Sequence, residues 1–199
     1  AALIPAAESV GAQGYVVGID LSEIMVQETA KELTRLGLSS NIEVRQMDAE
    51  HLQFPDESFD CVLCAFGIFF FPQLYLAMSE FRRVLKPNGR IVVTTWEKSW
   101  DEHWGWFDEL LKTHLPPEPE TSEPVESDSV SQPIFDTPEG LDAILNKAGF
   151  ANIEIVFEET DFVYATEEEH WSSLWSHGAR GSLEKIEQAN GADGLQRFK

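Results

Sequence analysis

Apolar and polar residues alternate along this chain in a pattern that predicts strands and helices in turn. Short, nearly continuous apolar runs predict strands over residues 15–19, 42–47, 60–66 and 90–96. The run over 60–66 is typical of a strand buried on both faces, and residues 86–89 read as a turn before the last strand. Several of the stretches between them repeat apolar residues every three or four positions, which is typical of amphipathic helices. We therefore expect an α/β fold with a mostly parallel sheet and helices on both of its faces.

The helices in the first half of the chain are indicated by residues that suit helix ends. We expect a short helix over residues 1–10, with Pro5 in its first turn. Ser22 suits the N-cap of the next helix, which Gly37 ends. Another helix follows Pro72, and its apolar face is formed by Leu74, Met78, Phe81 and Leu85.

The second half of the chain predicts helices on either side of a long polar segment. One helix is centred on residues 107–111, and another over 137–149 begins with the pair Thr137-Pro138. Between them, residues 116–133 contain five prolines, five acidic residues and no basic residue. We interpret this segment as an exposed, flexible acidic loop.

The last part of the chain predicts one more strand and two helices. Residues 153–157 read as a strand, and residues 162–164 extend it or pair with it. Residues 166–169 have the pattern of a capping box and open a helix rich in tryptophan. From Gly178 onward the pattern is that of a polar helix.

Residues suited to a nucleotide-like ligand stand at the ends of the predicted strands. Asp20 ends the first strand, Asp48-Ala49 the second and Phe66-Gly67 the third. The carboxyl ends of parallel strands form the edge at which α/β sheets bind ligands. The carboxylate of Asp20 suits the two hydroxyls of a ribose, and Asp48-Ala49 suits the edge of an adenine. Met25, in the following helical turn, suits the face of the same base.

Charge and cysteine content narrow the class of protein. The formal net charge of -21 argues against a nucleic acid as the substrate, because binding phosphates requires a basic surface. Cys61 and Cys64 offer no disulfide framework, so we expect a cytoplasmic protein. No stretch has the length and apolarity of a membrane span. The histidines show no metal-ligand spacing, and we expect no metal site.

Together, these motifs resemble the class I methyltransferases that use S-adenosylmethionine, in particular the small-molecule branch with the quinone-biosynthesis C-methyltransferases. The resemblance covers roughly residues 1–100. It is carried by the order and spacing of residues 17–22, 48–52 with Phe54-Pro55, 58–62 and 81–89. It implies a Rossmann-like three-layer sandwich with S-adenosylmethionine as the cofactor.

The resemblance also assigns roles to individual residues. Asp20 would bind the ribose, Leu21 and Met25 would flank the adenine, and Asp48 with Ala49 would bind its edge. Phe66 and Gly67 would lie near the methionine part of the cofactor.

The family pattern includes a first strand with a Gly-rich loop and a last antiparallel strand, and we expect this chain to lack both. We therefore expect residues 1–100 to be the cofactor-binding half of a methyltransferase domain, truncated at its N-terminus. Residues 101–199, with the acidic loop, would be the substrate-covering part of the same domain. The chain alone would then bind the cofactor weakly.

The expected reaction is in-line transfer of a methyl group to a small, apolar or ring-containing acceptor, because tryptophans crowd the second half of the chain. His103 and His177 are weak candidates for a base. Two alternatives stay open. One is a non-catalytic module with the methyltransferase fold. The other is an NAD(P)-dependent oxidoreductase, whose second strand ends in an acid, as the strand before Asp20 does here.

Overall fold

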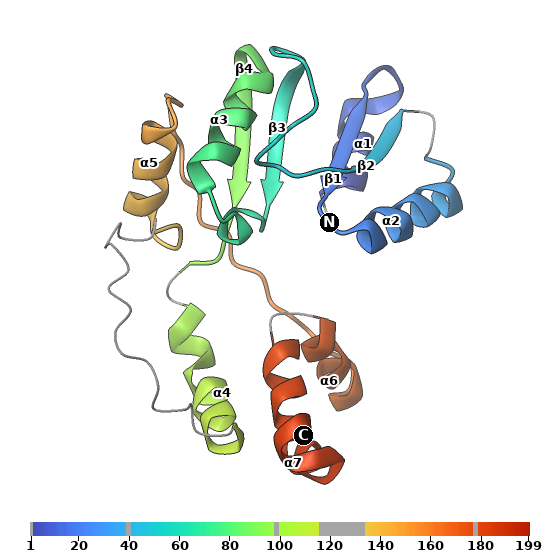
Figure 1. Cartoon of the computed structure of the whole chain (residues 1–199), viewed down its shortest axis with the longest axis vertical. Coiled ribbons are helices and arrows are strands. Elements are labelled where there is room, and N and C mark those ends of the chain that lie inside the picture. Colours follow the sequence, from blue (N-terminus) through green and yellow to red (C-terminus); the bar gives the residue numbers. More distant parts are fainter. Residues whose placement is uncertain (1, 39–40, 98–99, 116–133, 177–178) are drawn as a thin grey trace. The chain divides into compact units, whose positions relative to one another are not determined.

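A computed structural model describes residues 2–38, 41–97, 100–115, 134–176 and 179–199 (Figure 1). Contacts between residues divide the chain into two units. The first comprises residues 1–97 and 133–155, and the second residues 98–132 and 156–199. The sheets lie in the first unit, whereas the described residues of the second form helices and extended segments.

The first unit begins with a parallel strand pair that carries helices. Helix α1 (Leu3–Val10) precedes strand β1 (Val16–Asp20), and helix α2 (Glu23–Leu36) connects it to strand β2 (Ile42–Gln46). β1 and β2 pair in parallel, with Asp20 opposite Gln46. The helix over residues 1–10 and both strands are thus confirmed within a residue or two at each end.

Alternate residues of β1 face different sides of this pair. Val16 packs with the buried residues Ala7 of α1 and Leu33 of α2. Ile19 instead packs against the core that contains Phe81 of α3 (Leu74–Val84). Side chains therefore pack on both sides of β1, as the expected three-layer arrangement requires.

A second parallel pair completes the sheets of this unit. Strand β3 (Phe59–Ala65) pairs with strand β4 (Leu85–Thr94), and α3 connects them. Val62, Cys64, Ile91 and Val93 face a core that also includes residues of α3 and α5 (Pro138–Lys147). Its buried members are Met47, Leu52, Cys64, Ile68, Leu74, Ala77, Met78, Phe81, Val84 and Ile144.

The parallel strands form two separate sheets, whereas the sequence predicts one. Within the described ranges, β1 pairs only with β2 and β3 only with β4 (Figure 1). The expectation that β3 is buried on both faces is also wrong. Leu63 of β3 is 47% exposed and its partner Val92 of β4 is 49% exposed, because no described helix packs on that face.

The turn predicted at residues 86–89 lies inside β4 as a bulge. The register moves from Phe59–Leu85 to Cys61–Arg90, so residues 86–89 loop out of the pairing. Asn88 takes a positive φ of 65°. A Cβ at Gly89 would lie 2.9 Å from the carbonyl oxygen of Lys86, which explains the glycine at this position.

The second unit is built from helices α4 (Trp100–His114), α6 (Glu167–Ser176) and α7 (Arg180–Phe198). The capping box is confirmed, since Thr166 Oγ1 accepts the N–H of Glu169 at 3.1 Å. α7 bends at Gly191, where φ is 67°. The buried apolar core of the second unit contains Phe107, Leu111, Leu174, Leu183, Ile186 and Phe198.

The prediction of a strand at residues 153–157, with an extension or partner at 162–164, is wrong. These residues run as extended chain without a strand partner among the described residues, and a strand is stable only when its backbone groups are paired. Val156 and Phe157 are accordingly more than half exposed. The acidic segment 116–133 lies outside the described residues. None of the helices in the described ranges is long and apolar enough to span a membrane.

Candidate functional site

Asp20 ends β1, and its carboxylate is held in one direction by the start of α2. Its Oδ1 accepts the N–H of Ser22 at 2.8 Å. Ser22 in turn caps α2 by accepting the N–H of Met25 at 3.4 Å. Among the described residues, none donates to Oδ2 of Asp20, and the side chain is exposed. A fixed carboxylate with an open acceptor oxygen therefore stands at this edge of the sheet.

Asp48 lies beside Asp20, because β1 and β2 are paired in parallel. The N–H of Met47 donates to the carbonyl oxygen of Asp20 at 3.0 Å, which fixes the two strand ends together. Oδ1 of Asp48 accepts the N–H of Glu50 at 2.9 Å, and Oδ2 lies 3.3 Å from Nδ1 of His51. The hydrogen bond from Glu50, helped by His51, lowers the pKa of Asp48. Asp48 is therefore a charged acceptor at neutral pH.

Large apolar side chains that follow Asp20 closely in the sequence are exposed. Leu21 and Ile24 are each 70% exposed, and Met25 is 53% exposed. Exposed apolar residues that adjoin a fixed acceptor are typical of a ligand-binding surface. Next to Asp48, the N–H of Ala49 makes no hydrogen bond to any residue in the described part of the chain. The edge thus offers both acceptors and a donor beside an apolar surface.

Phe66 and Gly67 follow the end of β3. Phe66 has a positive φ of 52°, a conformation that costs about 1–2 kcal/mol in a residue other than glycine. Its N–H is held by Thr94, at 3.1 Å from the carbonyl oxygen and 3.2 Å from Oγ1. Its ring contacts that of Trp96, with centroids 4.4 Å apart. The strained backbone of this segment is thus at Phe66, since φ of Gly67 is -106°.

The packing explains why a glycine follows Phe66. A Cβ at Gly67 would lie 3.2 Å from Sγ of the buried Cys64. Cys64, Met47 and Ala49 belong to one core cluster, so the end of β3 and the segment after β2 share the same packing. The structure therefore brings Asp20, Leu21, Met25, Asp48 and Ala49 to one strand-pair edge, with Phe66 and Gly67 at the matching end of β3.

The two candidate bases are not placed in this site. His103 lies in α4 of the second unit, and its side chain is outside the described part of the structure. His177 lies outside the described residues altogether.

Sequence reasoning gave no role to Glu50, Glu80 or Arg83, although these residues hold the segment that carries Asp48. Leu52 N–H donates to Oε2 of Glu80 at 2.8 Å, and Arg83 binds the carbonyl oxygen of Leu52 at 2.8 Å. One available signal is the position of Glu80 and Arg83, three residues apart on a helix between apolar residues. Glu50 gives no comparable signal, because Asp48, His51 and Gln53 make its sequence neighbourhood polar.

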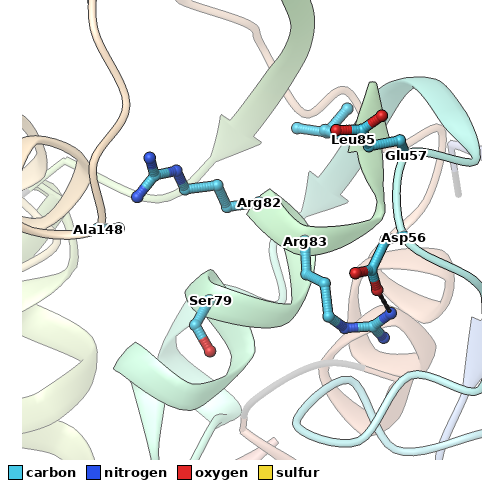
Figure 2. Close-up of a pocket in the computed structure, with 7 residues that line it drawn as sticks. All are labelled: Asp56, Glu57, Ser79, Arg82, Arg83, Leu85 and Ala148. Atoms are coloured by element: carbon cyan, nitrogen blue, oxygen red, sulfur yellow. Dashed lines mark hydrogen bonds and ion pairs between the residues drawn. The ribbon is translucent and has the colours of Figure 1, made fainter. Parts of the chain in front are cut away.

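A cavity of about 380 Å³ lies at the other end of the β3–β4 pair (Figure 2). It is lined by Asp56, Glu57, Ser79, Arg82, Arg83, Leu85 and Ala148. Leu85 is the first residue of β4 and Asp56 precedes β3, whereas Thr94 is the last residue of β4 and Phe66 directly follows β3. Figure 2 shows Arg83 paired with Asp56, at 2.7 Å. The charge of Arg83 is therefore compensated by Asp56. Because the cavity lies at the opposite end of the strands, it adds no group to the site at the strand ends.

Comparisons with known proteins agree with the geometry of the strand ends. A family model described as a methyltransferase domain matches residues 2–93. The aklanonic acid methyltransferase of Streptomyces sp. (strain C5) is 43% identical over 48% of this chain and 43% of its own length. The nocamycin O-methyltransferase of Saccharothrix syringae is 30% identical over 94% of this chain and 68% of its own length.

A relative from quinone biosynthesis is similar over a shorter range. The ubiquinone/menaquinone biosynthesis C-methyltransferase of Cronobacter sakazakii is 32% identical over 72% of this chain and 59% of its own length. The chain thus spans between 43% and 68% of these relatives. None of the three is an oxidoreductase, so that alternative has no support.

A solved structure supports the fold. The crystal structure of a methyltransferase dependent on S-adenosylmethionine from Aquifex aeolicus aligns with a TM-score of 0.51 and 24% sequence identity. The alignment covers 71% of this chain and 62% of that one. Together with the family model and the nocamycin O-methyltransferase, which aligns with 94% of this chain, this places the chain in the class I methyltransferases dependent on S-adenosylmethionine.

Proposed function

We propose that the full-length protein transfers a methyl group from S-adenosylmethionine to a small, apolar or ring-containing acceptor. The observation that carries the proposal is the strand edge at which Asp20 and Asp48 stand together beside exposed apolar residues. The three relatives are named for aklanonic acid, nocamycin and ubiquinone or menaquinone. These names favour a ring-containing acceptor.

The donors and acceptors at this edge fit the nucleoside part of the cofactor. The open Oδ2 of Asp20 suits a ribose hydroxyl, while Oδ1 stays with Ser22. Leu21 and Met25 offer an exposed apolar surface for a flat base. The carboxylate oxygens of Asp48 each have room for a second hydrogen bond, which suits the exocyclic amine of adenine.

When bound, S-adenosylmethionine supplies a methyl group carried on a positively charged sulfur. The acceptor atom must approach the methyl carbon opposite that sulfur, so that the new bond forms as the carbon–sulfur bond breaks and its electron pair stays on sulfur. We propose that the protein contributes mainly alignment. A base that removes a proton from the acceptor is needed only where the acceptor is a weak acid, and His103 and His177 remain the candidates.

The roles of the two parts of the chain belong to the same proposal. Residues 1–100 would bind the cofactor, and residues 101–199 would cover the acceptor, with the exposed Trp106 as apolar surface. The free cysteines Cys61 and Cys64 favour the cytoplasm, and the acidic charge disfavours a nucleic acid as the acceptor.

Transfer of a labelled methyl group tests this proposal. The full-length protein would be incubated with methyl-labelled S-adenosylmethionine and a panel of phenols, polycyclic aromatic acids and quinols, with an amino acid as the hydrophilic control. We expect label in at least one ring-containing acceptor and none in the control. Binding of the cofactor without transfer to any acceptor would contradict the proposal and favour a non-catalytic module.

A further inference from the structure

Glu50 is a buried acid that links the segment after β2 to the start of α3. It is 6% exposed, and burying a carboxylate is costly unless it is hydrogen-bonded. Its Oε1 accepts the backbone N–H of Gln73 at 2.6 Å, and its Oε2 accepts Nε2 of Gln73 at 3.3 Å. Gln73 is the N-cap of α3, where the positive end of the helix dipole favours a carboxylate. Glu50 thus fixes one end of the segment.

Side chains from the body of α3 hold the same segment further along. Residues 48–56 contain neither helix nor strand. Glu80 accepts the N–H of Leu52, and Arg83 donates to the carbonyl oxygens of Leu52 at 2.8 Å and Phe54 at 2.7 Å. Glu80 and Arg83 are themselves paired at 2.7 Å. The segment is therefore held in place by α3, at both its backbone and its side chains.

The connection reaches Asp48 through the backbone of Glu50. The N–H of Glu50 donates to Oδ1 of Asp48, so the position of Glu50 sets the direction of that carboxylate. We propose that Glu50 is a positioning residue, which fixes Asp48 for the 6-amino group of the adenine and thereby sets the selectivity for the base. This inference rests on the proposed function, since it takes the adenine to lie at Asp48.

Base selectivity distinguishes this role from simple stabilisation of the fold. A residue that only stabilises the fold would weaken the binding of all nucleosides alike when it is replaced. A residue that directs Asp48 changes the ratio between a base with a 6-amino group and one with a 6-oxo group. S-inosylhomocysteine carries a 6-oxo group and a hydrogen on N1, where S-adenosylhomocysteine has a 6-amino group and a bare N1. The ratio of the two Kd values therefore measures recognition of this edge of the base, at which we place Asp48.

The experiment measures the Kd of both ligands by calorimetry for the full-length protein and for Glu50→Ala and Glu50→Gln. We expect the unmodified protein to prefer S-adenosylhomocysteine by about tenfold or more. In Glu50→Ala the ratio should fall to within about twofold of one, because a freed turn no longer directs Asp48. Glu50→Gln keeps an acceptor for the N–H of Gln73 and should retain most of the preference.

Leu33→Ala is the matched control for lost stability. Leu33 is 4% exposed and packs in the separate cluster with Ala7 and Ile42, away from Glu50. This variant should lower the melting temperature and leave the ratio of the two Kd values unchanged.

The outcomes separate the inference from the proposed function. If the unmodified protein binds neither ligand, the proposed function fails, and the inference fails with it. If it prefers S-adenosylhomocysteine and a folded Glu50→Ala keeps the full preference, only the inference is overturned. Should Glu50→Ala not fold, Glu50→Gln decides: a folded variant with the preference retained supports the inference, and one that is unfolded or has lost the preference overturns it.

Discussion

Asp20 is the residue on which the cofactor assignment depends most. Its position at the end of an apolar strand could be predicted from the sequence, because a buried strand and a following N-cap are local patterns. The structure adds that Oδ1 is already used by Ser22 and that Oδ2 is open. Only the open oxygen is available to a ribose. Two different replacements of the side chain can therefore distinguish the loss of the hydrogen bond to Ser22 from the loss of the ligand contact.

Replacing Asp20 should weaken cofactor binding without unfolding the protein. Asp20→Ala removes a charged acceptor, and we expect the Kd for S-adenosylhomocysteine to rise by more than about tenfold. Asp20→Asn keeps an oxygen for the N–H of Ser22, so its Kd should rise less. Asp193→Ala removes an exposed acid from α7 and should leave the Kd unchanged. Equal Kd values for all the variants would show that Asp20 does not bind the ribose.

The contacts of Glu50 and Arg83 could not be predicted in the same way. Glu50 meets Gln73 at a separation of 23 residues, and Arg83 meets Leu52 at a separation of 31. Local patterns indicate where a helix begins or a strand ends, but they do not indicate which distant backbone group an acid or a guanidinium reaches. The motif residues of the site were therefore predictable, whereas the residues that hold them were not.

Helix α3 is the element that joins the core to the site. Its apolar face, with Met78 and Phe81, was predicted from the spacing of the residues and is buried in the core. Its polar side chains Glu80 and Arg83 bind the segment after β2. The guanidinium of Arg83 lowers the pKa of Glu80, so both groups are charged at neutral pH. α3 therefore stabilises the fold and orders the Asp48 segment at the same time.

Two neighbouring arginines of α3 allow a controlled test of this element. Arg83→Met removes the donors for Leu52, Phe54, Asp56 and Glu80, and should lower the free energy of unfolding by about 2–4 kcal/mol. Arg82 has no hydrogen bond to any described residue, so Arg82→Met should change the free energy of unfolding by less than about 1 kcal/mol. Urea unfolding of both variants measures the difference. Equal losses would show that the Arg83 contacts contribute nothing specific.

The element boundaries show where local patterns are insufficient. β1, β2 and α2 follow from apolar runs and caps, and they are observed within a residue or two of the prediction. The turn at residues 86–89 is instead a bulge, because β4 continues its pairing with β3 on both sides of it. Residues 153–157 have a strand-like sequence but no partner, and pairing is decided by distant parts of a chain.

At the scale of the whole molecule, each of the two units is built from two separate ranges of the sequence. Residues 133–155 fold with the N-terminal unit, although they follow α4 in sequence. The alternation of strands and helices predicted the α/β class, which the family model and the aligned relatives support. It did not predict two separate sheets, because the pairing of strand edges leaves no local trace in the sequence.

The most direct test of the central claim is a calorimetric titration of the full-length protein with S-adenosylhomocysteine and, separately, with NADH. Both ligands contain an adenosine ribose, so an acid at the end of β1 alone does not distinguish them. Membership of the methyltransferase family, with Asp20 and Asp48 at one strand edge, predicts saturable binding of S-adenosylhomocysteine and no binding of NADH. Binding of NADH with no heat from S-adenosylhomocysteine would contradict it.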